Sequence, residues 1–280
     1  TTGEINYTVN SGAYLQMAAE GTVITGTGTF TLSAGATLGI KSANGITAET
    51  GSATGNIRTT GGRSFSTVAN YIYNGTGSQS TGTGLPSGAI TGNVTIAGGA
   101  VVTSANAITE NGTLTVDGIL VPGSAAQVIS GTGTLTGSGT VHVNRTDATA
   151  DFLSQYTVSD KTLTNLTVEY TAAAGAQVVS ALTYSNLKLD NSSGTNSLAG
   201  TAAVTGTLTT TAGGTFDVGV NDLTVNALVN NGSIMINSTA VDINGSMTVS
   251  SVSGAGTATY TRYMPADAMW HYVSSPVGNS

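Results

Sequence analysis

Short segments with an apolar residue at both ends recur along the chain. Three-residue examples lie at 94–96, 114–116, 141–143, 166–168, 187–189, 223–225, 234–236 and 247–249. This spacing is typical of β-strands with one buried face. Turn-forming residues separate the segments, including Asn-Gly pairs that begin at Asn44, Asn74, Asn111, Asn231 and Asn244. We expect these glycines to supply the positive φ angles of tight turns.

Internal repeats suggest a modular chain. VITGTGTFT at 23–31 and VISGTGTLT at 128–136 share seven of nine residues. A longer correspondence aligns Tyr73, Gln79, Asn93 and Gly112, in order, with Tyr170, Gln177, Asn186 and Gly206. The offsets average about 95 residues, a period that indicates a repeat architecture. We therefore expect modules at roughly 1–68, 69–167 and 168–258.

Two all-β architectures fit short strands separated by short turns: a parallel β-helix (β-solenoid) with short irregular coils, and tandem antiparallel β-sandwich modules. Strands of three to five residues are shorter than most sandwich strands, which favours the solenoid. So does the variable repeat length, because each coil needs only a matching inward face. Charged residues are also scarce, as expected where equivalent side chains stack about 4.8 Å apart and like charges would repel.

Composition excludes several classes of protein. Charged residues make up 8% of the 280 residues, against about 25% in an average globular protein. A net charge of −7 with seven Lys and Arg argues against nucleic acid as a partner. The chain has no Cys, hence no disulfide framework or thiolate metal site. No apolar run is long enough for a transmembrane helix, and few helices are expected at all.

Several segments resemble the repeats of large secreted surface proteins of the Bacteroidetes type. The repeat-like segments are 74–86 (NGTGSQSTGTGLP), 93–96 (NVTI), 165–168 (NLTV) and 206–214 (GTLTTTAGG). The tail, 260–265 and 269–276, is similar to a segment that follows the repeat array in those proteins and opens the next domain. The resemblance implies an adhesin-like cargo of the type IX secretion route, located outside the cell or on its surface, and a piece of a longer protein.

The densest ionic stretch gives the first candidate site. Arg145, Asp147, Asp151, Asp160 and Lys161 lie close together in the least repeat-like part of the chain. Carbohydrate-active β-helices gather carboxylates and a cation in one groove, because these groups must act at one sugar. The alternative, which we favour, is a solvated insertion at a module junction. No catalytic residue, cofactor or metal is assigned; the turn at 190–196 offers oxygen ligands but lacks the second carboxylate of a tight calcium site.

Aromatic residues give a second candidate surface. Tyr263, Trp270 and Tyr272 lie in the only aromatic-dense stretch and could stack on sugar rings. We favour instead a cap, or the start of a following domain, over 259–280, since a solenoid must protect its open edge. Rows of alternating Thr at 25–31 and 132–136 raise a third possibility, an ice-binding face, which would need a Thr-x-Thr pair in nearly every coil.

Together these patterns predict a β-solenoid repeat region over 1–258. With the location that the resemblance implies, we expect a non-enzymatic structural or adhesive stalk segment of a secreted cell-surface protein. The alternatives are a carbohydrate-active or glycan-binding β-helix and an ice-binding Thr array. Expected partners are surface glycans, other copies of the chain, and the flanking domains of a longer protein.

Overall fold

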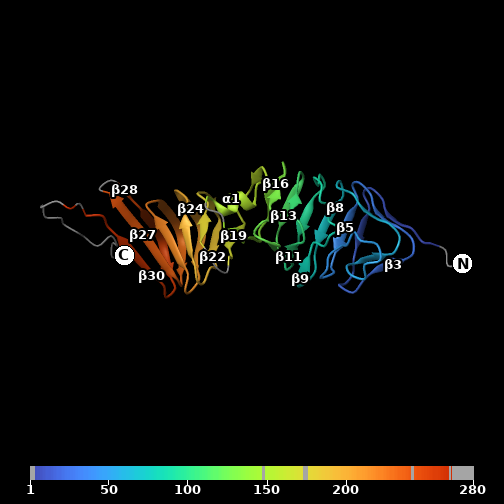
Figure 1. Cartoon of the computed structure of the whole chain (residues 1–280), viewed down its shortest axis with the longest axis horizontal. Coiled ribbons are helices and arrows are strands. Elements are labelled where there is room, and N and C mark those ends of the chain that lie inside the picture. The colour runs from blue at the N-terminus through green and yellow to red at the C-terminus, as the bar shows by residue number, and fades with distance from the viewer. Residues whose placement is uncertain (1–3, 147–148, 173–175, 241–242, 265, 267–280) are drawn as a thin grey trace. The chain divides into compact units, whose positions relative to one another are not determined.

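Short strands joined by tight corners make up almost all of the chain in the computed structural model, which describes residues 4–146, 149–172, 176–240, 243–264 and 266 (Figure 1). Two compact units are present. Unit 1 comprises Thr1–Arg145 with Leu153–Val168, and unit 2 comprises Thr146–Phe152 with Glu169–Ser280. Helix α1 (Asp151–Gln155) and strand β19 (Thr167–Tyr170) cross the division between them.

Unit 1 contains eighteen strands, most of them three or four residues long. They are β1 (Tyr7–Val9), β2 (Tyr14–Gln16), β3 (Ile24–Gly26), β4 (Phe30–Leu32), β5 (Thr37–Ile40), β6 (Ile57–Thr59), β7 (Arg63–Phe65), β8 (Asn70–Tyr73), β9 (Ser78–Ser80), β10 (Val94–Ile96), β11 (Val101–Ser104), β12 (Ile108–Thr109), β13 (Thr113–Val116), β14 (Ile119–Pro122), β15 (Ile129–Ser130), β16 (Thr134–Thr136), β17 (Thr140–Val143) and β18 (Asp160–Lys161).

Unit 2 contains longer strands. They are β20 (Gln177–Val179), β21 (Thr183–Tyr184), β22 (Asn186–Leu189), β23 (Thr195–Leu198), β24 (Ala202–Thr210), β25 (Thr215–Gly219), β26 (Asp222–Asn230), β27 (Ser233–Ala240), β28 (Ile243–Asn244), β29 (Ser246–Ser253) and β30 (Thr257–Thr261).

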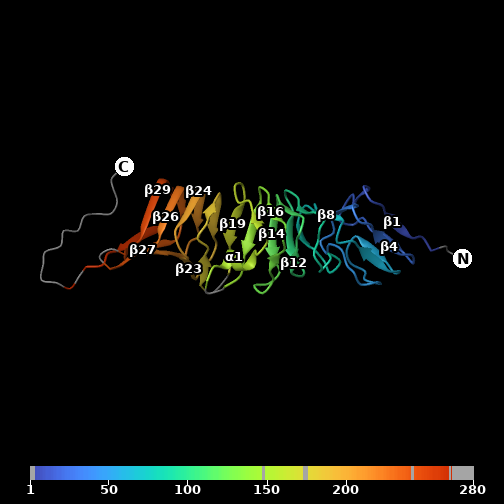
Figure 2. The same ribbon diagram turned by 90° about the horizontal axis from the view of Figure 1, so that it is seen from above.

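Each unit is a parallel β-solenoid. In unit 1, one face is a sheet of seven strands in the order β18-β16-β13-β10-β8-β5-β2, and a second face runs β17-β14-β11-β9. In unit 2, β22, β24, β26 and β29 form one face and β20, β23, β25, β27 and β30 another, and Figure 2 shows β24, β26 and β29 side by side. Among the described strand pairs, the pair β27–β28 is antiparallel and the others are parallel. The solenoid prediction is confirmed, and the sandwich alternative is not what the chain adopts.

Alternation of apolar and polar residues builds the core. On the seven-stranded sheet, Val94, Leu114 and Leu135 occupy equivalent positions in successive coils, and each is 0% exposed. Their neighbours Thr115 and Thr136 are paired in the same register and face outward, half-buried. Each strand therefore adds one or two residues to an apolar column, which explains why three-residue strands suffice.

Buried glutamine side chains close equivalent corners in the two units. The backbone N–H of Gly75 donates to Oε1 of Gln79 over 2.7 Å, and the N–H of Ala172 donates to Oε1 of Gln177 over 3.0 Å. Both glutamines are at most 4% exposed. A buried backbone donor needs a partner, and the side-chain amide supplies it where the chain turns. This shared role accounts for the alignment of Gln79 with Gln177 in the sequence repeat.

Corner asparagines join one coil to the next. Oδ1 of Asn93 accepts a hydrogen bond from the Thr113 N–H (3.1 Å), and Oδ1 of Asn186 accepts one from the Thr207 N–H (2.9 Å). The same contact joins Asn6 to Thr29, Asn70 to Asn93, Asn111 to Thr132 and Asp117 to Ser138. The repeated Asn is thus an inter-coil connector.

Glycines serve two different purposes at the corners. In the Gly-x-Gly corner at 131–133, Gly131 has a φ of 122°, and a Cβ at Gly133 would lie 2.1 Å from the carbonyl oxygen of Gly112 in the preceding coil. The first glycine therefore permits the turn, and the second permits the coils to approach. The same pairing occurs at 26–28, 137–139 and 254–256.

The Asn-Gly pairs do not behave as expected from sequence. Only Gly45 of the five has a positive φ, of 62°. Gly112 and Gly245 are required for another reason, since a Cβ on either would lie about 2 Å from a carbonyl oxygen of the preceding coil. Close stacking of backbones, rather than turn conformation, selects glycine at these positions.

Candidate functional site

Of the acidic residues proposed from sequence, the two that the structure describes, Asp151 and Asp160, differ in their exposure. Asp151 begins helix α1 and is 0% exposed, and its Oδ2 accepts a 2.6 Å hydrogen bond from the backbone N–H of Val178. Placing Asp151 on the surface was wrong, because its side chain is buried and engaged by the backbone of unit 2. Asp160 is exposed on β18. Asp151 and Asp160 belong to different units, and we assign them no joint site. Asp147 lies outside the described residues.

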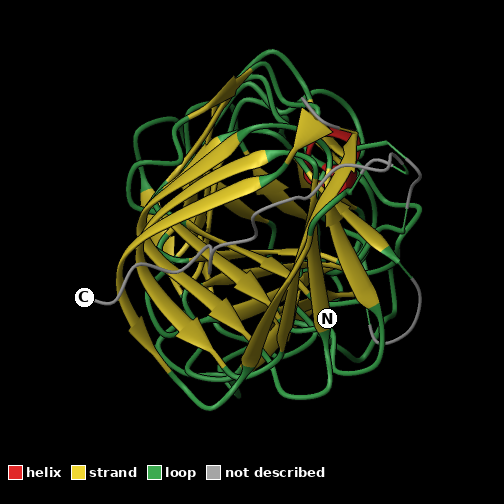
Figure 3. Ribbon diagram, turned by 90° about the vertical axis from the view of Figure 1, so that its left-hand side faces the viewer, coloured by secondary structure: helices red, strands yellow, loops and turns green. Residues whose placement is uncertain are grey.

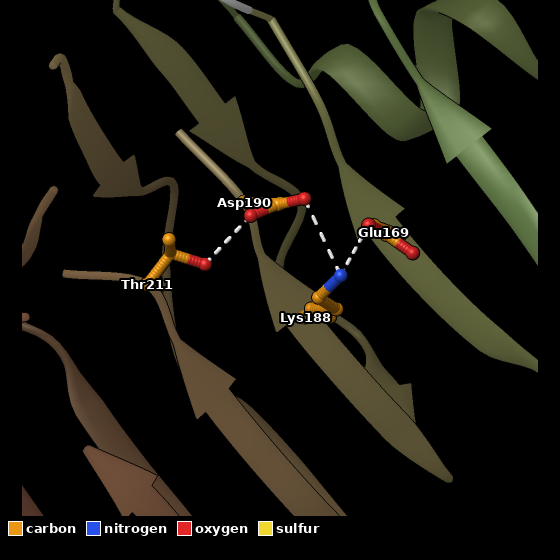
Figure 4. Close-up of polar contacts among 4 residues, drawn as sticks. All are labelled: Glu169, Lys188, Asp190 and Thr211. Carbon is orange, nitrogen blue, oxygen red and sulfur yellow. Dashed lines mark hydrogen bonds and ion pairs between the residues drawn. The ribbon is translucent and has the colours of Figure 1, made fainter. Parts of the chain in front are cut away.

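An ionic cluster on the outer face of unit 2 was not anticipated. Nζ of Lys188 on β22 lies 2.7 Å from Oε1 of Glu169 on β19 and 3.3 Å from Oδ2 of Asp190 (Figure 4). The hydroxyl of Thr211 donates to the other oxygen of Asp190 over 2.7 Å. Lys188 is paired in register with Thr209 of β24, so no like charge lies beside it there. Opposite charges on neighbouring strands avoid the repulsion that a column of lysines would create.

The cluster keeps its members charged. Burial by itself lowers the pKa of Lys188, but the hydrogen bond and charge of Glu169, with the charge of Asp190, outweigh it and raise the pKa. The hydrogen bond from Thr211 lowers the pKa of Asp190 against the opposing effect of burial, and the charge of Lys188 lowers it further. A lysine held as the cation is not a nucleophile or base. The arrangement therefore links neighbouring strands through ion pairs and hydrogen bonds.

Glu110 is a buried carboxyl group in unit 1. It follows β12 and forms a parallel bridge with Ile90, and it is 0% exposed. Its Oε1 accepts a 2.9 Å hydrogen bond from the Gly112 N–H, whereas Oε2 has no hydrogen-bond partner in the described part of the chain. Burial raises the pKa of Glu110 to about 7, although the Gly112 hydrogen bond opposes the rise. The alternation Ile108-Thr109-Glu110 already places Glu110 on the buried side of its strand.

The guanidinium of Arg63 is committed to its own loop. It donates to the Thr59 carbonyl oxygen (2.7 and 3.0 Å), to Oγ1 and the carbonyl oxygen of Thr47 (2.7 and 3.2 Å), and to the Ser52 carbonyl oxygen (3.3 Å). These contacts hold the long excursion between β5 and β6 against β7. Because its donors point to loop oxygens, Arg63 acts as a structural clamp.

The aromatic candidates are mostly beyond the described chain. Tyr263 is described and 41% exposed, whereas Trp270 and Tyr272 lie outside the described residues. Five tyrosines earlier in the chain are core residues: Tyr71, Tyr73, Tyr156, Tyr170 and Tyr184 are each 0% exposed. Their hydroxyls bond to backbone groups, as when Tyr73 donates to the Thr81 carbonyl oxygen over 2.9 Å.

The threonine rows are shorter than the sequence suggested. Thr25 belongs to β3 and Thr31 to β4, which lie in different sheets, because the chain turns at Gly26. On the seven-stranded sheet the Thr-x-Thr pair recurs on two adjacent strands, β13 and β16. An ice-binding face would need it in nearly every coil.

No group of three or more His, Cys, Asp or Glu that could hold a metal ion occurs among the described residues. In the turn at 190–196, the Asp190 carboxylate is already engaged by Lys188 and Thr211. Across the described ranges, no helix is long and apolar enough to span a membrane.

No protein-family model, curated protein or solved structure matches the chain.

Proposed function

We propose that the chain is a non-enzymatic structural and adhesive stalk segment of a secreted cell-surface protein. The observation that carries this proposal is the continuity of the parallel ladders within each unit, in which every coil is bonded to the next on more than one face. Corner asparagines add side-chain bonds between coils. Stacked coils of this kind form a stiff element whose stability comes from nearest-neighbour contacts.

The condition of the ionisable groups supports a structural role. Lys188, Glu169 and Asp190 satisfy one another, and Arg63 is bound to its own loop. Glu110 is enclosed, so a substrate would have no route to its carboxylate without the coils opening. Catalysis needs side chains that converge on a reacting atom. Here the charged side chains of Lys188 and Arg63 contact other groups of the chain instead.

The secreted location rests on the sequence resemblance. The segments 74–86 and 206–214 resemble repeats of Bacteroidetes-type surface proteins, which implies export by the type IX route. Surface glycans or other copies of the chain are the proposed partners, and flanking domains of a longer protein are what the stalk would carry.

Labelling of intact cells tests the location. An antibody raised against residues 4–264 should label unpermeabilised cells of the source organism, and protease added outside the cells should remove the signal. Labelling that requires permeabilisation would overturn the proposal.

An adhesion assay tests whether the ionic cluster is structural or takes part in binding. Cells carrying the double variant Glu169→Gln with Lys188→Met should adhere to a glycan-coated surface as well as wild type. Loss of adhesion by this variant, with the fold intact by circular dichroism, would instead assign the ionic cluster a direct role in binding.

A further inference from the structure

The last strands of unit 2 are paired on one side only. β29 pairs with β26, and β30 pairs with β27; within the described part of the chain no strand follows either of them in its sheet. Figure 3 looks onto the end of unit 2 at which β30 lies in Figure 1 and β29 lies in Figure 2. A row of backbone N–H and C=O groups on each strand is thus available to a further strand.

Within the described part of the chain, the apolar core becomes exposed at this end. Leu208, Leu228 and Val252 occupy one column on β24, β26 and β29, and their exposed fractions are 0%, 5% and 69%. The same surface carries Val249, which is half-buried, whereas its partner Val225 in the preceding coil is 1% exposed. An apolar surface next to open strand edges is a typical binding site.

Other exposed apolar side chains lie in the same part of the chain. Ile243 is 50% exposed, Tyr263 41% and Met264 52%. We call the surface formed by β29, β30 and Val252 the end surface. A segment that binds the end surface must supply backbone hydrogen bonds to the open strand edges. It must also supply a large apolar side chain to cover the end of the core column.

We propose that the end surface binds residues 269–273 of the same chain, added as a further strand. This segment reads Met-Trp-His-Tyr-Val. It has high β-propensity and no Asp, Glu, Lys or Arg, so covering an apolar column costs it little. In an extended strand Trp270 and Tyr272 share one face, which suits them to cover Val252. β30 ends at Thr261, and the eight residues from there to Met269 can span up to about 26 Å.

The chain contains a single Trp, so Trp270 fluorescence reports on this segment alone. In the full chain, iodide should quench Trp270 several-fold less efficiently than it quenches the free peptide 267–273. Val252→Asp should restore quenching to that of the peptide. The matched control is Val68→Asp in unit 1, where Val68 is 46% exposed, and it should leave quenching unchanged. Quenching of the wild-type chain equal to that of the peptide would overturn the proposal.

A thiol measurement covers the case in which Val252→Asp does not fold. The chain has no Cys, so Val252→Cys introduces a unique thiol. Its alkylation by iodoacetamide should accelerate several-fold when Trp270→Ser is added, while Val68→Cys should react at the same rate in both backgrounds. A second copy of the chain could occupy the end surface instead. In that case the protection of Trp270 and of the introduced thiol would disappear on dilution, and sedimentation would show a dimer; this result would overturn the proposal.

Discussion

The side-chain oxygen of Asn111 accepts a 2.9 Å hydrogen bond from the backbone N–H of Thr132, which lies twenty-one residues later in the next coil. Asp117 makes the same contact with Ser138 at 3.0 Å. An Asn or Asp at a corner therefore accepts a hydrogen bond from a backbone N–H that has no partner in the strand ladders. This relationship connects the recurring Asn of the sequence to the cohesion of neighbouring coils.

Removing this acceptor should weaken unit 1 modestly. We expect Asn111→Ala to lower the free energy of unfolding by about 0.5–1 kcal/mol, because the Thr132 N–H loses its protein partner but can reach water. Asn111→Asp keeps the acceptor, as Asp117 does naturally, and should stay close to wild type. Urea unfolding followed by circular dichroism measures both. Equal loss in the two variants would contradict a role for the acceptor.

Much of the solenoid was predictable from residue patterns. Alternation such as Val94-Thr95-Ile96 identified the strands, and the alignment of Asn93 with Asn186 identified a real structural equivalence. The scarcity of helix was also predictable: one described helix, α1, is five residues long.

What could not be predicted depends on contacts between distant residues. The need for glycine at Gly112 arises from the Gly92 carbonyl oxygen, 1.9 Å from where a Cβ would lie, and sequence spacing does not reveal that approach. Asp151 is buried, and the backbone N–H that it binds belongs to Val178, 27 residues later in the sequence. The cluster around Lys188 was missed because its contacts join residues that are far apart in sequence. Glu169 lies 19 residues before Lys188, and Thr211 lies 21 residues after Asp190.

Glu110 should make stability depend on pH. Burial raises its pKa to about 7 from an ordinary 4.5, so the folded state holds a proton that the unfolded state releases between these values. Below about pH 4.5 the Glu110 carboxyl is protonated in both the folded and the unfolded state, so its burial costs no stability through titration. The free energy of unfolding then falls as the pH rises from 4.5 through 7. At 1.36 kcal/mol per pH unit, the whole effect amounts to about 3 kcal/mol above pH 7.

The variant Glu110→Gln removes this titration. Its melting temperature should exceed that of wild type at pH 8, and the difference should shrink as the pH falls toward 4.5. Glu20→Gln, at a solvent-exposed position, is the matched control and should follow the wild-type profile. Scanning calorimetry across the pH range measures this, and parallel profiles for Glu110→Gln and wild type would contradict the assignment.

Lys188 and Glu169 should be energetically coupled. Lys188→Met leaves the Glu169 carboxylate, whose side chain is 11% exposed, without its lysine, and Glu169→Gln removes that charge. A double-mutant cycle should give a coupling free energy of about 1 kcal/mol, because the pair is only partly shielded from water. The coupling should decrease in 1 M NaCl, where the Debye length is only about 3 Å. A coupling near zero at low salt would mean that the 2.7 Å contact does not stabilise unit 2.

Close approach of coils should make Gly133 intolerant of any side chain. A Cβ there would lie 2.1 Å from the Gly112 carbonyl oxygen, so Gly133→Ala must push neighbouring coils apart or break the hydrogen bond from the Gly133 N–H to the Glu110 carbonyl oxygen. We expect a loss of about 1–3 kcal/mol in the free energy of unfolding, the usual cost of overpacking.

Gly77→Ala is the matched control in the same unit, since nothing lies within 4 Å of its Cβ position and its φ is not positive. There the reduced freedom of the unfolded chain should leave stability unchanged or raise it by about 0.4–1 kcal/mol. Thermal unfolding measures the melting temperature of both variants. If Gly133→Ala and Gly77→Ala melt at the same temperature, the contact between coils at Gly112 and Gly133 is not what selects glycine in the Gly-x-Gly corner.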